Sequence, residues 1–422
     1  MKYALAKNIT RHASLCYSIT GESPSSEAQL VRLETLNWNE VVEFRKVYSP
    51  AGKYDVVLAA RLGQEHERLW SNPGKPIWRL IVFEYEDTAM NPGFERVVDM
   101  AFISHHAIVD GISASAFHKS LLLFLQEACT LQNLESDWPL IIPRHIFKPQ
   151  HLEDFMNYTP KSNSLITGSP PSSSAWTASP PSLPSIWDYK SRVHIITVPI
   201  GKLPSILNSC RRLQTTITGL LHSFIVIKLS KLVQKAQGFK AVTPYSMRRF
   251  TGVPSTEIAN HISYITSSWP ASLLGRARSC SPNTSDEDEI ITSISQQYKS
   301  EISDELGRVS THGPQMLNNV SAINNFTDYC KGLTDSRSHT YELSNIGVVT
   351  LPTPPEPVNI KLDKLVFTQC GMVAGPAIGF GVVSLAGGPL VVSIYWQEGI
   401  LEEELMEELR CSLEERLLAF AG

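Results

Sequence analysis

The chain has 422 residues, of which 37 are Lys or Arg and 41 are Asp or Glu, so its formal net charge at pH 7 is −4. This length suffices for two or three domains, or for one large two-lobed unit. The near balance of charge lacks the basic footprint of a protein that binds nucleic acid or an anionic membrane surface. A small, mostly uncharged substrate suits this balance better.

The cysteines and the amino terminus bear on the cellular compartment. The seven cysteines stand singly, without a Cys-x-x-Cys pair, so neither a disulfide framework nor a zinc ribbon is expected. The opening stretch MKYALAKNITRHASLCYSI is interrupted by Lys7, Arg11 and His12, which favours an amphipathic helix over a secretory signal. No run reaches the ~18 apolar residues of a membrane span. We therefore expect a cytoplasmic protein without an integral membrane segment.

Three apolar stretches follow the opening helix, and all are expected to be extended. They are YDVVLAARL at 54–62, PIWRLIVFEYE at 76–86 and ERVVDMAFISHHA at 95–107. The sequence thus predicts strands that lead into a polar motif beginning at residue 104.

A second helix is expected directly after this motif. Apolar residues recur at helical spacing over 117–128, and Ser113 and Ser115 are candidate caps behind the turn-forming pair Asp110-Gly111. The motif should therefore lie between a buried strand and the start of a helix.

The composition changes between Thr159 and Trp187, where the chain is rich in Pro and Ser, has almost no charge and contains two Pro-Pro pairs. Neither a helix nor a central strand accommodates such a run. We predict an N-terminal lobe over 1–158, a linker over 159–187 and a C-terminal lobe over 188–422.

The second lobe is expected to alternate strands and helices. RVHIITVPI at 192–200 predicts a strand, and TTITGLLHSFIVIKLSKLVQ at 215–234 predicts a buried helix capped by its threonines. The acidic run in 284–303 favours a helix start, where the macrodipole stabilises negative charge. Leucines four apart in 399–420 indicate a final helix packed on a sheet.

The stretch SHHAIVDGIS, residues 104–113, carries the chemistry-bearing residues. If the preceding strand continues, His105 and His106 point to opposite faces and do not ligate one metal, so no metal site is expected. The Asp110-Gly111 turn should bring the carboxylate back beside the histidines while glycine keeps the approach open. A histidine oriented in this way suits general base catalysis, whereas the alternative is a hydrogen-bonded core histidine.

The pattern HHxxxDG, matched here by His105, His106, Asp110 and Gly111, resembles the signature of the CoA-dependent acyltransferase superfamily. That superfamily includes chloramphenicol acetyltransferase, plant BAHD acyltransferases and nonribosomal peptide condensation domains. Further segments resemble the fungal alcohol acetyltransferase family, and together they cover nearly the whole chain apart from the linker. These segments are PIWRLIVFE, CRRLQTTITGLLHSFIV, TPYSMRRF, IANHISYITSSW, TYELSNIGVV and VVSLAGGPLVVSIYWQEGI.

Two features depart from the pattern of this superfamily. Its members normally open with a strand before the first helix, and this chain begins at the helix, which suggests a shortened gene product or an unusual first lobe. The DFGWG loop of the plant enzymes is absent, and Gly379-Phe380-Gly381 is a weak counterpart.

The resemblance implies an α/β (α+β) fold of two chloramphenicol-acetyltransferase-like lobes, each a mixed β-sheet flanked by helices, with a tunnel between them. It implies that His106 is the base for direct attack on an acyl-CoA thioester, with acetyl-CoA as co-substrate and no metal. Asp110 is then expected to pair with an arginine and to hold the motif loop. Arg79 in PIWRLIV is the candidate partner.

Supporting roles are expected for four other residues. His105 should be a hydrogen-bonded support, and Gly111 should keep the channel clear. Ser344 and Asn345 in ELSNIG are candidate oxyanion donors, although a polar pair that simply ends a strand is the alternative.

Three hypotheses for the function follow. The first is an acyl-CoA-dependent O-acyltransferase, acting as a monomer and acetylating a small alcohol or a secondary metabolite; an amine acceptor stays open. The second keeps the fold but takes the acyl group from a carrier-protein thioester, which would make an acyl carrier protein the partner. The third is a non-catalytic binding protein of the same fold, which an intact HHxxxDG disfavours.

Overall fold

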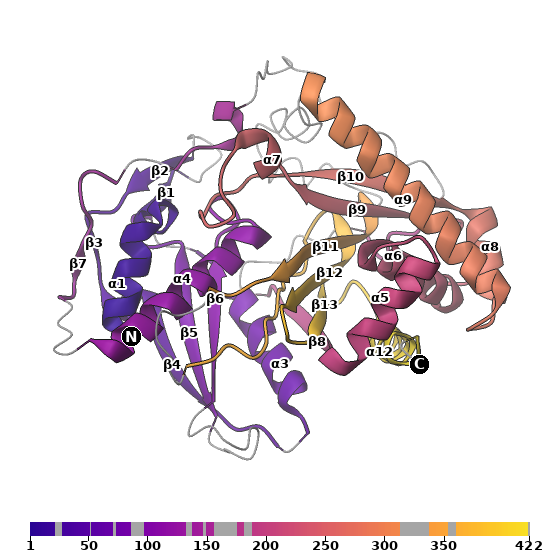
Figure 1. Cartoon of the computed structure of the whole chain (residues 1–422), viewed down its shortest axis with the longest axis horizontal. Coiled ribbons are helices and arrows are strands. Elements are labelled where there is room, and N and C mark those ends of the chain that lie inside the picture. The colour runs from indigo at the N-terminus through magenta and orange to yellow at the C-terminus, as the bar shows by residue number, and fades with distance from the viewer. Residues whose placement is uncertain are drawn as a thin grey trace.

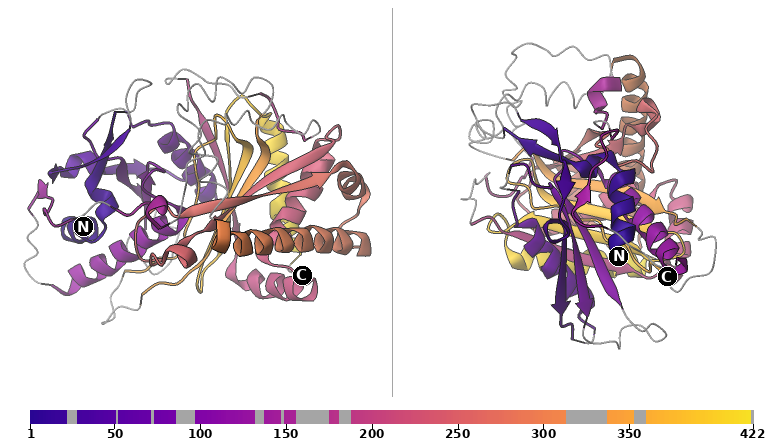
Figure 2. Two further views of the ribbon diagram at one scale, coloured as in Figure 1. Left: turned by 90° about the horizontal axis from the view of Figure 1, so that it is seen from above. Right: turned by 90° about the vertical axis from the view of Figure 1, so that its left-hand side faces the viewer.

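A computed structural model describes residues 1–21, 28–50, 52–70, 73–85, 97–131, 137–146, 149–155, 175–180, 188–312, 337–352 and 360–420. The chain forms two lobes that lie side by side, each with a mixed β-sheet and helices (Figures 1 and 2). This arrangement confirms the predicted fold class. No helix in the described part of the chain is long and apolar enough to cross a membrane.

The N-terminal lobe is built on a three-stranded sheet in the order β4-β5-β6. Strand β5 (Trp78–Tyr85) is central, parallel to β4 (Val42–Val47) and antiparallel to the edge strand β6 (Val98–Ser104). Helices α1 (Lys2–Arg11) and α4 (Gly111–Thr130), both expected from the sequence, pack on one face of this sheet. Small elements complete the lobe: β1 (Tyr17–Thr20), β2 (Gln29–Arg32), β3 (Thr35–Leu36), α2 (Trp38–Val41) and β7 (Leu140–Ile141).

The prediction of an extended stretch at 54–62 is wrong, because these residues form helix α3 (Tyr54–His66). Leu58, Ala59 and Leu62 are buried at helical spacing and pack between the two sheets, whereas Val56 is exposed. Apolar residues run almost continuously through this stretch, and such a run does not distinguish a helix from a strand by its period.

The C-terminal lobe is built on a six-stranded sheet in the order β10-β9-β11-β12-β13-β8. Strand β11 is parallel to both of its neighbours, and the other pairs are antiparallel. The strands are β8 (Ser191–Val198), β9 (Gly238–Ser246), β10 (Ile262–Pro270), β11 (His339–Val349), β12 (Pro376–Leu385) and β13 (Leu390–Gln397).

Helices cover one face of this sheet and enclose the largest apolar core. They are α5 (Leu203–Arg212), α6 (Ile217–Leu232), α8 (Ala271–Ser279), α9 (Ser285–His312) and α12 (Glu403–Ala419). The predicted strand near 192 and the helices in 215–234, 284–303 and 399–420 are thereby confirmed. Thr216 caps α6 by accepting a hydrogen bond from Gly219 N at 3.1 Å.

In the described part of the chain, contacts between the lobes include those made by three segments. Helix α3 of the N-terminal lobe packs on the uncovered face of the C-terminal sheet, so closely that a Cβ on Gly63 would lie 2.7 Å from Ser191 O. Residues 252–261, here called the crossing arm, insert Ile258 into the N-terminal core. Residues 360–370, here called the strap, run between the lobes, and Ile360 O accepts a hydrogen bond from Gln126 of α4 at 3.2 Å.

Most of the predicted linker lies outside the described residues, so the proposed lobe boundaries stay predictions. Residues 175–180 are described, and they lie against the C-terminal lobe. Trp176 N donates to Gly238 O at 2.9 Å, and its ring meets the ring of Phe239 edge-on.

Candidate active site

The two histidines of the motif lie in a turn just after β6. The strand ends at Ser104, so the prediction that alternation sends His105 and His106 to opposite strand faces is wrong. His105 is tied into the turn, because its backbone N–H donates to Ile77 O at 2.9 Å and its Nδ1 accepts from Ala107 N at 3.1 Å. His106 is exposed, and both histidines line a cavity between the lobes.

Asp110 is the cap of helix α4. Its Oδ1 accepts a hydrogen bond from Ser113 N at 2.7 Å, the usual bond that the third residue of a helix donates to the cap side chain. Ser113 and Ser115 are therefore the third and fifth residues of the helix, and their predicted capping role is wrong. The helix begins at Gly111, and Gly111 and Ala114 of its first turn line the cavity.

Asp110 does pair with an arginine, but its partner is Arg248, which lies in the short helix α7 (Arg248–Thr251) of the C-terminal lobe. Arg248 Nη2 lies 3.1 and 3.2 Å from the two carboxylate oxygens, and Asp110 and Arg248 are only 2 and 7% exposed. The predicted partner Arg79 instead contacts Glu65 of α3. Alternation along β5 points Arg79 away from α4, which packs on the opposite face of that sheet.

The crossing arm contacts the motif at successive residues. Ala259 N donates to Ser113 Oγ at 2.9 Å, and His261 N donates to Asp110 Oδ2 at 3.1 Å. Asn260 lies between them, and its Nδ2 donates to His106 O at 2.7 Å and is 3.2 Å from His106 Nδ1. The arm thus contacts both the backbone and the ring of His106. Neither Asn260 nor Arg248 was predicted, since both are about 140 to 150 residues from their partners in the sequence.

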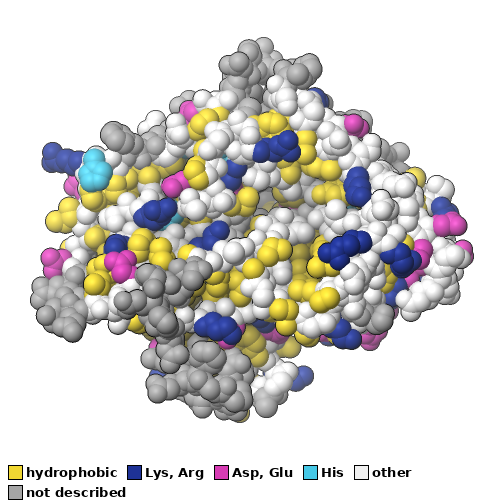
Figure 3. Space-filling model, in the orientation of Figure 1, with side chains coloured by type: hydrophobic (Ala, Val, Ile, Leu, Met, Phe, Trp, Pro, Cys, Tyr) yellow, Lys and Arg dark blue, Asp and Glu magenta, His cyan; other side chains and the backbone are white. Residues whose placement is uncertain are grey.

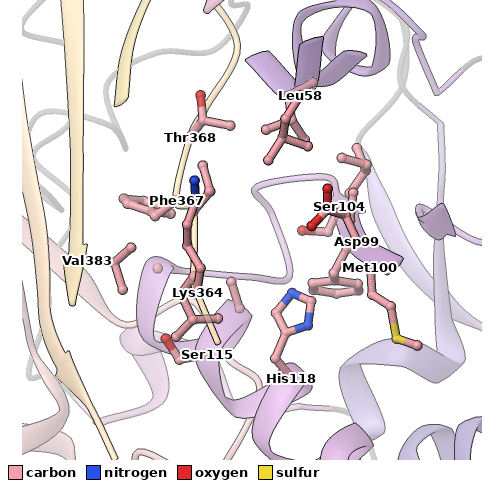
Figure 4. A pocket seen from close by; sticks show the side chains of 18 of the residues that line it. Leu58, Asp99, Met100, Ser104, Ser115, His118, Lys364, Phe367, Thr368 and Val383 are labelled. Carbon is pink, nitrogen blue, oxygen red and sulfur yellow. The ribbon is translucent and has the colours of Figure 1, made fainter. Parts of the chain in front are cut away.

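The cavity between the lobes has a volume of about 1530 Å³. In the close view of Figure 4, Asp99, Met100 and Ser104 of β6 form one side with Ser115 and His118 of α4. The His118 ring meets Phe102 and Phe117 edge-on. Burial lowers the pKa of His118 to about 4, so this imidazole is neutral at pH 7.

The opposite side is formed by strand β11 and the strap, from which Lys364, Phe367 and Thr368 project in Figure 4. Alternate residues of β11, Glu342, Ser344 and Ile346, line the cavity. Of the two predicted oxyanion donors, only Ser344 is therefore brought to the cavity.

Asn345 points to the other face of the strand. Its Nδ2 donates to Thr218 Oγ1 at 3.1 Å, and its Oδ1 accepts from Gly347 N at 2.9 Å. Both bonds lie away from the cavity, so the structure separates Asn345 from the motif.

Gly111 lies where the two sides of the cavity meet. A Cβ at this position would be 2.4 Å from Ile346 Cγ2 and 3.2 Å from Phe367 Cζ, so glycine permits this close approach of α4, β11 and the strap. Gly111 also lines the cavity, and its role in keeping a channel clear stays a prediction.

Glu342 is a further cavity residue, which no motif in the sequence indicated. Its side chain is buried, and Oε1 accepts hydrogen bonds from Gln369 Nε2 at 2.9 Å and from Tyr395 Oη at 3.2 Å. Burial raises the pKa of Glu342 to about 7, against the opposing effect of these two donors.

On the face shown in Figure 3, the side chains between the lobes are mainly apolar or uncharged, and basic side chains are spread singly. Two mixed sheets, a cavity between them and an HHxxxDG turn at their junction define the class of CoA-dependent acyltransferases and condensation domains. The sequence profile of the alcohol acetyltransferase family matches residues 22–418. The chain belongs to this family.

Curated relatives from fungi support the assignment. The probable alcohol acetyltransferase crmB of Aspergillus fumigatus is 23% identical, over 97% of this chain and 88% of that relative. The probable alcohol acetyltransferase FCK4 of Fusarium pseudograminearum is 25% identical, over 100% of this chain and 86% of that relative. The resemblance stated from the sequence is confirmed, and the protein is an acyltransferase.

Solved structures share the fold. The trichothecene 15-O-acetyltransferase TRI3 of Fusarium sporotrichioides superposes with a TM-score of 0.66 at 14% identity, covering 99% of this chain and 85% of that chain. SgcC5 of Streptomyces globisporus superposes with a TM-score of 0.59 at 10% identity, covering 100% of this chain and 88% of that chain. At these identities the likeness concerns the fold.

Proposed function

We propose that this acyltransferase moves an acetyl group from acetyl-CoA to the hydroxyl of a small alcohol or a secondary metabolite, with His106 as the general base. The observation that carries the proposal is the position of His106, which lines the cavity at the junction of the lobes and is contacted from the second lobe by Asn260. A base must lie within reach of the proton that it removes, and this junction is the point where two substrates would meet.

The chemistry needs one proton transfer in each direction. His106 Nε2 takes the proton of the acceptor hydroxyl while the oxygen attacks the thioester carbonyl. The tetrahedral intermediate then collapses, the C–S bond breaks, and the departing sulfur takes the proton from the imidazolium. No covalent acyl-enzyme forms, because the acceptor attacks the thioester directly.

The tautomer of His106 follows from this role. Nε2 must be free of hydrogen to act as a base, so the hydrogen of the neutral ring is on Nδ1. The 3.2 Å contact between Nδ1 and Asn260 Nδ2 then joins two donors and is not a hydrogen bond, so Asn260 holds His106 through the carbonyl oxygen, to which Nδ2 donates at 2.7 Å. Asn260 is a positioning residue in this scheme.

Ser344 is the proposed oxyanion donor. It lies on the cavity face of β11, two residues from Ile346, which approaches Gly111 at the start of α4. A hydroxyl aimed at the developing oxyanion stabilises the charge in the transition state more than in the ground state. We propose Ser344 alone for this role, since Asn345 is directed elsewhere.

The size of the cavity supports a reaction of two substrates. Typical pockets for a single ligand measure ~300–1,000 Å³, and this cavity measures about 1530 Å³. Holding both reactants in line within it would contribute to the rate in addition to the base.

The first experiment compares wild type, His106→Ala and His145→Ala with acetyl-CoA and a panel of alcohols, following thiol release and ester formation. His145 is an exposed histidine outside the cavity and is the matched control. Loss of a general base lowers the rate by ~10²–10⁴-fold, so we expect this loss for His106→Ala, with unchanged thermal unfolding and acetyl-CoA binding. Full activity of His106→Ala would contradict the role of the base.

A second arm tests the donor. Wild type is offered the same acyl group as a CoA thioester and as a carrier-protein thioester. We expect the CoA ester to be consumed. Consumption of the carrier-bound group alone would overturn the assignment of acetyl-CoA and leave acyl transfer itself in place.

A further inference from the structure

Glu342 differs from the other carboxylates that line the cavity in the described part of the chain. Asp55, Asp110 and Asp363 each contact a Lys or Arg side chain. Each of the two carboxylate oxygens of Asp99 accepts a hydrogen bond from a tyrosine hydroxyl. Glu342 contacts no cation among the described residues, and both of its hydrogen bonds end on Oε1.

Three strands in register hold this carboxyl in place. Glu342 of β11 lies opposite Gly379 of β12, which in turn lies opposite Tyr395 of β13. A Cβ on Gly379 would be 1.8 Å from the Tyr395 ring, so the glycine lets that ring cross β12 and bring its hydroxyl to Glu342. Gln369 of the strap contacts Glu342 Oε1 at 2.9 Å and Tyr395 Oη at 2.8 Å.

The second oxygen of this carboxyl is available to a ligand. Oε2 has no hydrogen-bond partner among the described residues. It is also not one of the fully buried polar atoms without a partner, so part of its surface is accessible. Glu342 lines the same cavity as Ser344, two residues further along β11. Two residues of a strand span ~6.6 Å, so the backbone positions of Glu342 and of the proposed oxyanion donor Ser344 are about this far apart.

We propose that Glu342 binds a second hydrogen-bond donor on the acceptor, a hydroxyl or an amino group about the length of a short alkyl chain from the hydroxyl that is acylated. The favoured acceptor is then a diol or an amino alcohol. The other side of the cavity, with Met100, Phe102 and Leu125, suits its apolar body. This inference rests on the proposed acetyl transfer.

The ionisation of Glu342 tunes this recognition. Burial raises the pKa of Glu342 to about 7, so its ionised fraction grows as the pH passes through neutrality. The titratable groups facing it are Tyr395 and Cys370, and burial raises the pKa of each above its ordinary value, so both stay protonated. The strand neighbours Val242 and Gly379 are uncharged. The preference for acceptors with a second hydroxyl or amino group should therefore rise between pH 6 and pH 8. This window extends about one pH unit below and above the pKa of Glu342.

The experiment measures kcat/KM for three acceptors, hexanol, hexanediol and aminohexanol, with acetyl-CoA as the acyl donor. Hexanediol and aminohexanol carry a polar group at both ends of the chain. Wild type, Glu342→Gln and Asp363→Asn are compared, the last being a matched carboxylate-to-amide change at a paired residue. One hydrogen bond to a charged group corresponds to a preference of about tenfold or more. We expect wild type and Asp363→Asn to show this preference, and Glu342→Gln to lose it together with its pH dependence while keeping its activity on hexanol.

Each remaining outcome has a distinct meaning. An equal loss on all three alcohols, or a change confined to the KM of acetyl-CoA, would overturn the proposal, the latter by assigning Glu342 to the amides of the donor. Absence of acetyl transfer to any alcohol by wild type would instead contradict the proposed function. If Glu342→Gln does not fold, Tyr395→Phe is used instead. Loss of the tyrosine hydroxyl as a donor raises the pKa of Glu342, so the pH midpoint of the preference should shift upward. An unchanged midpoint would contradict the proposal.

Discussion

At the scale of single residues, the motif works through contacts that its own sequence does not contain. Asp110 caps α4 and binds Arg248, and the same network fixes the crossing arm that reaches His106. The motif histidines and aspartate could be identified from the sequence because their spacing is short and typical of the family. Their partners could not, because a pairing across about 140 residues depends on how the two lobes pack.

The first prediction concerns the buried pair. Asp110→Asn leaves the Arg248 guanidinium buried without its counter-charge, and breaking a buried pair costs ~3–5 kcal/mol. We expect a lower midpoint of urea unfolding, less soluble protein and lower turnover. A double-mutant cycle should give coupling of Asp110 with Arg248 and none with Arg79; coupling to Arg79 would contradict the observed pairing.

The second prediction concerns Gly111. Gly111→Ala places a methyl group 2.4 Å from Ile346 Cγ2, and overpacking of this kind costs ~1–3 kcal/mol. We expect lower stability and lower kcat/KM, both measured on the purified variant. Adding Ile346→Ala removes the clashing atom and should restore part of each loss, whereas a Gly111→Ala enzyme equal to wild type would show that this approach is not tight.

At the scale of elements, the sequence predicted helices α6, α9 and α12, which cover one face of the C-terminal sheet. It did not predict helix α3, which packs between the two sheets. The leucine repeat of α12 places Leu409, Leu413 and Leu417 in the core, as expected. The acidic start of α9 was expected from the macrodipole, yet Glu287 in that turn is also buried against Arg416 of α12. Local propensity predicted the helix, while the ion pair is a property of the packed lobe.

The third prediction tests this pair between helices. Arg416→Met leaves the Glu287 carboxylate buried without its cation, with an expected loss of ~3–5 kcal/mol in the free energy of urea unfolding. Arg276→Met removes an exposed pair with Glu289 between α8 and α9, and exposed pairs contribute ~0–1 kcal/mol. Equal effects of the two substitutions would argue against a structural role for Arg416.

At the scale of the whole molecule, two lobes and a cavity between them were predictable from the resemblance to a known family. The composition of the cavity was not, because its sides come from β6, α4, β11 and the strap, which are distant in the chain. Residues such as Glu342 and Gln369 have no recognisable pattern until the strands are in register. The sequence alone therefore indicates acyl transfer far better than it indicates the acceptor.

The fourth prediction concerns the pH dependence of stability. The pKa of Glu342 is raised to about 7 from an ordinary value of 4.5, so the folded protein retains a proton that the unfolded chain releases between these values. The contribution of Glu342 is present below pH 4.5 and is lost as the pH rises through about 7. The unfolding free energy of wild type minus that of Glu342→Gln should therefore fall as the pH rises from 4.5 to about 7. A difference that grows would contradict the raised pKa.

In the proposed reaction, His106 removes the proton of the acceptor during acetyl transfer. The most direct test of this role is the rate of ester formation from acetyl-CoA by His106→Ala at saturating substrates, relative to wild type and to His105→Ala. We expect the rate of His106→Ala to fall by ~10²–10⁴-fold in a folded enzyme that still binds acetyl-CoA, with a smaller loss for His105→Ala. Turnover of His106→Ala comparable to wild type, or a collapse found only in His105→Ala, would contradict this role.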